Sequence, residues 1–321
     1  MSLTVSNLSK KYGSKTVLRN LSFEMPGPGV YALLGTNGAG KTTTIRMMLG
    51  MLAKDSGEVL WNGKPLDTAT CNVGYLAEER GLYPKYPLMD QLIYFAALRG
   101  VSKAEARKRI RYWAERLQVE EYLYPGKMTV SDRGGKKKRS VRPKLADQLS
   151  KGNQQKIQFM TALISDPDLL ILDEPLSGLD PVNADLFREV IREEIAKGKY
   201  LIMSSHQMAT VEEFCTDLTI LHRSEALLQG NLNEIKKSYG RVHLKLKTEQ
   251  DVSLLVQDCG ISCISEKECE YQLKVTGEDQ ANQLLAELIK NKIRVITFDL
   301  REPSLHEIFV STVGGEGNEA E

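Results

Sequence analysis

Gly35, Gly40, Lys41 and Thr42 have the types and the spacing of a phosphate-binding loop. They match the pattern G-x4-G-K-[ST], which lies between the apolar run VYALLG and the helix-like run TTTIRMMLGML. A strand, a glycine-rich turn and a helix in this order let backbone N–H groups and the positive end of a helix dipole surround an anion. A glycine-rich turn that binds nothing is the weaker interpretation, because both the pattern and its context are complete.

The side chains of this loop predict a nucleotide triphosphate as the anion. The ammonium of Lys41 would reach the β- and γ-phosphates, and the hydroxyl of Thr42 would ligate Mg²⁺. The residues that we expect to contact the nucleotide here are Gly35, Thr36, Asn37, Gly38, Ala39, Gly40, Lys41, Thr42 and Thr43.

Two carboxylates follow a second apolar run, DLLILDEP, at residues 168–175. Asp173 would hold Mg²⁺ through its water shell, and Glu174 would accept a proton from an attacking water. A solvated acidic loop is the alternative, and it would be the better interpretation if the run stood alone. Together with the phosphate loop, the pair predicts hydrolysis.

His206 ends another apolar run, KYLIMSSH. A lone histidine is more often structural than catalytic. The carboxyl end of a buried parallel strand is, however, the side on which such sheets bind ligands. We therefore expect His206 to bond a γ-phosphate oxygen and the attacking water.

A second polar stretch with a glycine, QLSKGNQQK, begins at residue 148, more than a hundred residues after the phosphate loop. Glycine marks a backbone that bends tightly or that something approaches closely. Ser150 and Gly152 at the start of a predicted helix therefore suggest another anion contact.

The runs around these residues predict the elements that position them. Strands are expected within residues 3–35 and in the runs GEVLWNG, NVGYLAEE, DLLILDEP and KYLIMSSH. Helical patterns span about 88–117, follow QLSKGNQQK, and recur in ADLFREVIREEIAKG. This alternation predicts an α/β core with a largely parallel sheet. From about residue 230–240 onward, short alternating strands and one clear helix predict a separate small α+β domain.

Composition sets limits on the class of protein. The chain has 321 residues, a net charge of +1 and 41% hydrophobic residues, which suits about two folded domains and demands no polyanionic partner. Its five cysteines form no paired framework, which predicts reduced thiols. Cys259, Cys263 and Cys269 are expected in strands, without metal-ligand spacing. No run approaches the ~18 apolar residues of a membrane span, so a membrane role would use a partner chain.

Taken together, these motifs resemble the nucleotide-binding subunit of an ATP-binding cassette (ABC) transporter over roughly residues 1–230. GTNGAGKTT fits the Walker A loop, LSKGNQQK the family signature, DLLILDEP the Walker B strand, SGLD the D-loop and SSHQM the histidine loop. Tyr12 in KKYG fits the aromatic residue that stacks on adenine, and GYLAEERGLYP fits the segment that couples to the permease. The signature separates this family from kinases and GTPases.

The resemblance implies a fold, cofactors and partners. The implied fold is an α/β P-loop cassette at 1–230, with an antiparallel β subdomain, a helical subdomain at about 85–165, a C-terminal α+β domain at 231–315 and a disordered tail at 316–321. ATP and Mg²⁺ are the implied cofactors. The implied partner is an integral membrane permease, which would hold this subunit at the cytoplasmic face of the cell membrane. No nucleic-acid partner is expected.

The resemblance also answers the question of the second glycine. In this family two subunits pair head to tail, as a homodimer or with a second cassette, and each signature contacts the ATP of the partner. Ser150 and Gly152 would therefore act in trans, and Asp180 of SGLD would help to link the two sites. ATP would close the dimer and hydrolysis would open it, which would drive the attached membrane protein.

The sequence departs from the family pattern in three places. Lys151 and Asn153 replace residues of the usual LSGGQ signature. Glu78 stands where a glutamine is usual, and its carboxylate can accept hydrogen bonds from Mg²⁺-bound water but brings a charge. The segment 126–148 is longer than the family needs and carries Lys136, Lys137, Lys138 and Arg139. A solvated loop is favoured there over contact with lipid headgroups or RNA.

The C-terminal part resembles an accessory domain of prokaryotic export cassettes, and REPSLHEIF fits its closing helix. The leading hypothesis is therefore an ATPase subunit that powers export through a separate permease. A soluble ABC-type mechanical ATPase acting on the ribosome or nucleic acid is the alternative, and only the basic segment favours it. A non-catalytic regulatory cassette is disfavoured because Lys41, Asp173, Glu174 and His206 are all present.

Overall fold

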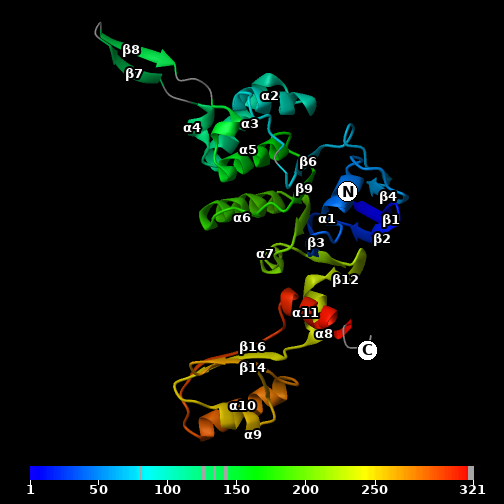
Figure 1. Ribbon diagram of the computed structural model, residues 1–321, viewed down its shortest axis with the longest axis vertical. Coiled ribbons are helices and arrows are strands. Elements are labelled where there is room, and N and C mark those ends of the chain that lie inside the picture. Colours follow the sequence, from blue (N-terminus) through cyan, green and yellow to red (C-terminus); the bar gives the residue numbers. More distant parts are fainter. Residues whose placement is uncertain (80, 125–126, 133–134, 141–143, 317–321) are drawn as a thin grey trace. The chain divides into compact units, whose positions relative to one another are not determined.

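The computed structural model describes residues 1–79, 81–124, 127–132, 135–140 and 144–316 (Figure 1). The chain divides into two compact units. The first comprises Met1–Gln207 and Phe214–Gln229, and the second comprises Met208–Glu213 and Gly230–Glu321. The end of the predicted disordered tail, 317–321, lies outside the described residues. Within the described part of the chain, no helix has both the length and the apolar character needed to cross a membrane.

A six-stranded sheet forms the centre of the first unit, with the order β12-β11-β3-β10-β9-β6. β3 (Gly29–Gly35) pairs in parallel with β10 (Tyr200–Ser205) and with β11 (Asp217–His222), and β9 (Leu169–Asp173) pairs in parallel with β10 and β6 (Val73–Leu76). Every residue of β9 and β10 is buried, as expected for parallel strands that are covered on both faces. The predicted parallel core is confirmed.

An antiparallel sheet packs onto the same core. It has the order β2-β1-β4-β5, with β1 (Leu3–Tyr12), β2 (Lys15–Met25), β4 (Ser56–Trp61) and β5 (Lys64–Pro65). Alternate residues of β1 and β2, including Leu3, Val5 and Leu21, share one hydrophobic cluster with Ile45 of α1 (Lys41–Met48) and with Leu33 of β3. This shared cluster fixes the phosphate loop between the two sheets.

Helices form the next part of the first unit, within the range 85–165 for which a helical subdomain was expected. They are α2 (Leu88–Leu98), α3 (Lys103–Arg116), α4 (Glu120–Leu123), the 3-10 turn η1 (Ala146–Gln148) and α5 (Lys151–Leu163). α2 packs on α3 and α5, and α5 packs on β6. α6 (Pro181–Ala196) follows β9.

The basic segment differs from the predicted loop. Its backbone forms an antiparallel hairpin of β7 (Lys127–Asp132) and β8 (Gly135–Ser140), which pair only with each other among the described strands. A run of charged residues gives no apolar alternation, so this pairing had no hydrophobic signature in the sequence.

The second unit is built on a four-stranded antiparallel sheet with the order β14-β15-β13-β16. Figure 1 shows α9 and α10 on the same side of it. The alternation of Leu244 and Leu246 in β13 faces a core completed by Leu284 of α10. The elements are β13 (His243–Thr248), α9 (Ser253–Asp258), β14 (Ser262–Lys267), β15 (Glu270–Lys274), α10 (Glu278–Lys290) and β16 (Val295–Arg301).

Three further helices belong to this unit: α7 (Met208–Glu212), α8 (Leu232–Tyr239) and α11 (Leu305–Glu316). β12 (Glu225–Asn231) precedes α8. The expected strand positions of the cysteines hold only for Cys263, because Cys259 caps α9 and Cys269 lies in the turn between β14 and β15. The turn requires a positive φ of 61° at Cys269, which no strand pattern reveals.

Candidate active site

The phosphate loop runs from the end of β3 to the first turn of α1. Its glycines adopt positive φ angles of 148° at Gly35, 81° at Gly38 and 108° at Gly40. A Cβ atom would lie 2.4 Å from the carbonyl oxygen of Leu221 at Gly35, and 2.7 Å from that of Val17 at Gly40. The loop therefore needs glycine both for its conformation and for its close packing.

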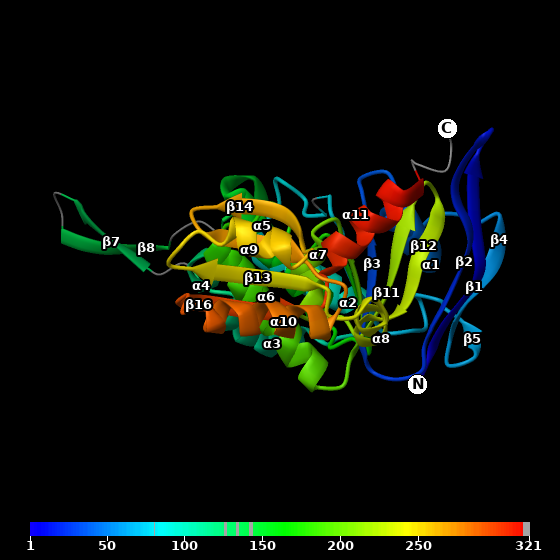
Figure 2. The ribbon, with the colours of Figure 1, turned by 90° about the horizontal axis from the view of Figure 1, so that it is seen from below.

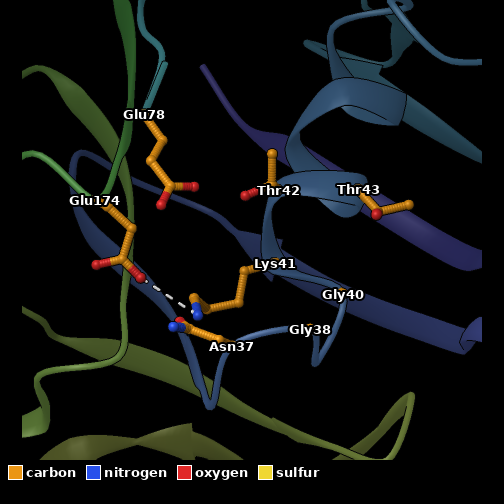
Figure 3. A pocket seen from close by; sticks show the side chains of 8 residues that line it. All are labelled: Asn37, Gly38, Gly40, Lys41, Thr42, Thr43, Glu78 and Glu174. Carbon is orange, nitrogen blue, oxygen red and sulfur yellow. Dashed lines mark ion pairs between the residues drawn. The ribbon is translucent and has the colours of Figure 1, made fainter.

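Lys41 points back across the loop. Its Nζ donates to the carbonyl oxygen of Gly35 at 2.9 Å, and the residue is only 5% exposed. The ammonium lies 3.3 Å from Oε1 of Glu174, and both residues line a cavity of about 210 Å³. Figure 3 shows this ion pair with the lining residues Asn37, Gly38, Gly40, Lys41, Thr42, Thr43, Glu78 and Glu174. Thr36 and Ala39 complete the loop through a turn between their backbones.

Glu174 is held by groups on three sides. Its backbone N–H donates to Ser204 Oγ at 2.9 Å, its Oε2 lies 2.9 Å from Nδ1 of His206, and its Oε1 faces Lys41. The residue is 6% exposed and adopts a φ of 50°. Oε1 makes no hydrogen bond of good geometry despite the nearby ammonium. Such a backbone conformation and an unsatisfied buried carboxylate oxygen are typical of functional sites.

Asp173 and Thr42 form the candidate cation site. Thr42 Oγ1 donates to Asp173 Oδ1 at 3.3 Å, and Ser204 Oγ donates to the same oxygen. Burial raises the pKa of Asp173, with a contribution from the charge of Glu174, whereas the hydrogen bonds from Ser204 and Thr42 lower it. Its Oδ2 is buried without a hydrogen-bond partner. A hydroxyl, a carboxylate and an orphaned oxygen suit a hard cation such as Mg²⁺.

Glu78 enters the cavity from the segment after β6. In Figure 3 its carboxylate points toward Thr42, on the side of the pocket that Glu174 also lines. Gln158 of α5 holds this segment, because its Nε2 donates to the carbonyl oxygens of Ala77 and Glu79 at 2.9 Å each.

Tyr12 is the last residue of β1, and its ring is outside the cavity lining. The residue is 51% exposed, and Lys10 Nζ lies 5.5 Å from the ring centroid. An exposed aromatic face of this kind is available for stacking.

The second glycine lies at a helix start, as predicted. Ser150 is the N-cap of α5, and its Oγ accepts from the backbone N–H of Asn153 at 3.3 Å. A Cβ atom at Gly152 would meet Asn183 Nδ2 at 3.4 Å, which is ordinary contact. Asp180 is the N-cap of α6 and accepts from Asn183 N at 3.0 Å, and the backbone hydrogen bond lowers the pKa of Asp180.

Within the described chain, most of the predicted residues thus form two groups, and Tyr12 belongs to neither. Lys41, Thr42, Glu78 and Glu174 line one cavity, next to Asp173 and His206. Ser150, Gly152 and Asp180 lie together at the starts of α5 and α6, and none of them lines that cavity.

Ser204 and Gln158 were not predicted. A buried serine inside the apolar run YLIMSS was a possible signal, because a hydroxyl in a covered strand needs a partner. Gln158 sits in a helix whose sequence is polar on several sides, so nothing distinguished it.

Comparison with known proteins agrees with this geometry. Residues 18–177 match the model of the ABC transporter family, and residues 230–313 match that of the DrrA1-3-like ATP-binding protein C-terminal domain. The uncharacterized ABC transporter ATP-binding protein YhaQ of Bacillus subtilis (strain 168) is 40% identical over 97% of this chain and 98% of its own length.

Two further matches give the same result. The Nod factor export ATP-binding protein I of Paraburkholderia xenovorans (strain LB400) is 32% identical over 70% of this chain and 68% of its own. A solved structure described as the ATP-binding subunit of an ABC transporter superposes with a TM-score of 0.64, at 29% identity, over 74% of this chain and 93% of that chain. The chain therefore belongs to the ATP-binding subunits of ABC transporters, with a DrrA-like C-terminal domain, and it is an ATPase.

Proposed function

We propose that this subunit hydrolyses ATP to power export through a separate membrane permease, by closing and opening a head-to-tail dimer. The hydrolytic role is supported most directly by the buried carboxylate of Glu174, which lies between Lys41 and His206 beside the phosphate loop. The export role is supported by the relative that is named for Nod factor export and by the accessory domain.

The proposed chemistry begins with the exchange of partners at Lys41. The β- and γ-phosphates of ATP would compete with Glu174 for the ammonium, which now lies 3.3 Å from Oε1. Glu174, released from Lys41, would accept the proton of an attacking water. His206, within 2.9 Å of the same carboxylate, would orient that water and bond a γ-phosphate oxygen.

Thr42 and Asp173 would hold Mg²⁺, and Glu78 would contact its water shell. The cation supplies charge neutralisation at the β- and γ-phosphates when bound. Asp173 must be ionised for this role, and its buried oxygen would then find a partner.

The arrangement of Ser150, Gly152 and Asp180 supports action in trans. These residues lie together at two helix starts but do not line the cavity of their own chain. A helix N-terminus with an uncrowded glycine is suited to the γ-phosphate of an ATP held by a second chain, a homodimer partner or another cassette.

Reconstitution tests the export role. The tagged chain, isolated from membranes in mild detergent, should bring with it a multispan membrane protein, and that protein in liposomes should raise ATP turnover. Sedimentation of the chain with ribosomes or nucleic acid instead, and no membrane protein, would contradict the permease partnership and favour a mechanical ATPase.

A further inference from the structure

Gln158 of α5 is a buried residue whose amide reaches the loop that carries Glu78. Its Nε2 donates to the carbonyl oxygens of Ala77 and Glu79, each at 2.9 Å, and the residue is 6% exposed. Both partners are acceptors, so only an NH2 group, with its two hydrogens, can make this pair of bonds. The amide therefore holds the backbone on both sides of Glu78.

The loop around Glu78 depends on this contact because it has no secondary structure of its own. In the described chain, residues 77–79 follow β6 and belong to no helix or strand, and Glu78 and Glu79 are both exposed. Arg46 also approaches the loop, at 3.9 Å from Glu79 Oε1, but both of these side chains are exposed. An exposed ion pair of this length contributes little to holding a backbone in place.

α5 is itself firmly placed against β6, the strand that precedes the loop. A Cβ atom at Gly74 of β6 would lie 2.2 Å from the carbonyl oxygen of Ala162 on α5. Helix and strand therefore approach so closely that only glycine fits between them. Gln158 thus connects the loop to an element that has little freedom to move.

Asn72 makes a similar pair of bonds at the other end of β6. Its Nδ2 donates to the carbonyl oxygens of Ser165 and Asp166, at 3.0 Å each, shortly after the end of α5. None of these three residues lines the cavity beside the phosphate loop. Loss of the Asn72 amide would therefore weaken the contact between strand and helix but leave the loop at Glu78 in place.

The opposite side of the cavity is fixed by packing. Thr42 belongs to α1, whose Ile45 and Met48 are almost fully buried in the hydrophobic cluster that α1 shares with β1 and β2. Figure 2 shows β1, β2 and β4 of that sheet side by side. In Figure 3 the carboxylate of Glu78 points toward Thr42. The hydrophobic cluster thus sets the position of Thr42, whereas the bonds of Gln158 set that of Glu78.

We propose that Gln158 is a positioning residue for Glu78, which keeps the Glu78 carboxylate where the water shell of Mg²⁺ would lie. This inference rests on the proposed contact of Glu78 with that water shell. Losing a hydrogen bond that orients a metal-site group commonly lowers metal affinity by about 10- to 100-fold. Gln158 acts here through the backbone of the loop and without contact to nucleotide or cation.

The test measures the affinity of the full-length chain for a fluorescent, non-hydrolysable ATP analogue, once with Mg²⁺ and once with EDTA. Gln158→Met retains the length and volume of the buried side chain but has no N–H to donate. It should weaken binding with Mg²⁺ about tenfold and change binding in EDTA by less than about twofold, because the phosphate loop is untouched. Asn72→Leu is the matched control and should leave both affinities unchanged.

A double-mutant cycle shows whether Gln158 acts through Glu78. In the Glu78→Ala background, Gln158→Met should cause no further loss of affinity with Mg²⁺, because the carboxylate that it positions is gone. An undiminished loss in that background, or an equal loss in Asn72→Leu, would overturn the proposal. If Gln158→Met does not fold, Gln158→Ala gives the same comparison.

The single variant Glu78→Ala separates this inference from the proposed function. A loss of affinity with Mg²⁺ in Glu78→Ala, without such a loss in Gln158→Met, would overturn the positioning role alone. Wild-type affinity with Mg²⁺ in Glu78→Ala would contradict the proposed role of Glu78, and the positioning role of Gln158 would fall with it.

Discussion

At the scale of single residues, the site is a set of buried charges that the fold leaves partly unsatisfied. Glu174 Oε1 and Asp173 Oδ2 are both buried without a hydrogen bond, within the reach of Lys41 and Thr42. Burying such groups costs free energy unless a partner arrives. We infer that nucleotide and cation provide those partners, so that their binding lowers the free-energy cost of burying these oxygens.

Replacing the proposed base tests its chemistry. Glu174→Gln should lower kcat by about 10²-fold or more, because an amide cannot accept the proton of the attacking water. ATP binding should persist, since Lys41 keeps its place on the loop through Gly35. Rapid-quench hydrolysis and equilibrium binding of a fluorescent ATP analogue measure the two properties. Near-normal hydrolysis would remove Glu174 as the base.

Replacing the proposed cation ligand should weaken the binding of Mg²⁺ without weakening the binding of ATP. Asp173→Asn removes a charge but retains an acceptor for Thr42 and Ser204. We expect a clear rise in the Mg²⁺ concentration that half-activates hydrolysis, with little change in the affinity for ATP without metal. Titration of hydrolysis with Mg²⁺ checks this, and an unshifted titration would exclude Asp173 as a ligand.

At the scale of elements, the sequence predicted the parts with a strong pattern. The apolar runs of β3, β9 and β10 and the loop motif together placed Lys41 and Glu174 on one edge of a sheet, because parallel strands end on the same side. The hairpin of β7 and β8 and the contact of Ser204 with Glu174 were missed. Neither a charged hairpin nor a single buried hydroxyl has a periodic pattern, and both depend on tertiary context.

The start of α5 is the element that the trans mechanism needs. Ser150→Arg places a long cation at the N-terminus of α5, where it should prevent ATP-driven dimerisation by obstructing the partner and opposing the helix dipole. ATP binding by the monomer should remain. Ser150→Ala loses the cap, which should cost ~1 kcal/mol of stability, and also the hydroxyl proposed to contact the partner's phosphate, so it should weaken dimerisation less than Ser150→Arg does. Dimerisation of Ser150→Arg at wild-type ATP concentrations would refute the trans role.

The junction between the C-terminal sheet and α11 predicts a dependence of stability on pH. Burial lowers the pKa of His243, an effect that the nearby Glu307 opposes. Below its ordinary value of 6.5 the unfolded chain binds a proton that the folded chain resists, so the free energy of unfolding should fall as the pH drops from there. Thermal unfolding of wild type and His243→Gln between pH 7.5 and 5.5 measures this. The variant should lose less stability, and equal losses would contradict the assignment.

At the scale of the whole molecule, the chain combines an ATPase unit with a second unit that includes the helix after His206. The two units therefore do not separate at a single point in the sequence. The change of pattern in the sequence predicts a boundary near 230–240, and no local signal marks the five-residue helix α7 as part of the later domain. α7 contacts the later domain through α11 and through the ion pair of Glu212 with Lys236 of α8.

The proposed mechanism depends on ATP joining two subunits. Ser150 and Gly152 lie outside the cavity of their own chain, and in the proposed mechanism they contact the ATP of a second copy. The most direct measurement is sedimentation of Glu174→Gln with ATP and Mg²⁺, compared with ADP and Mg²⁺. We predict a dimer with ATP that reverts to monomer with ADP, and loss of that dimer when Ser150→Arg is added. A monomer in both nucleotides, together with wild-type hydrolysis whose rate per subunit does not depend on protein concentration, would contradict it.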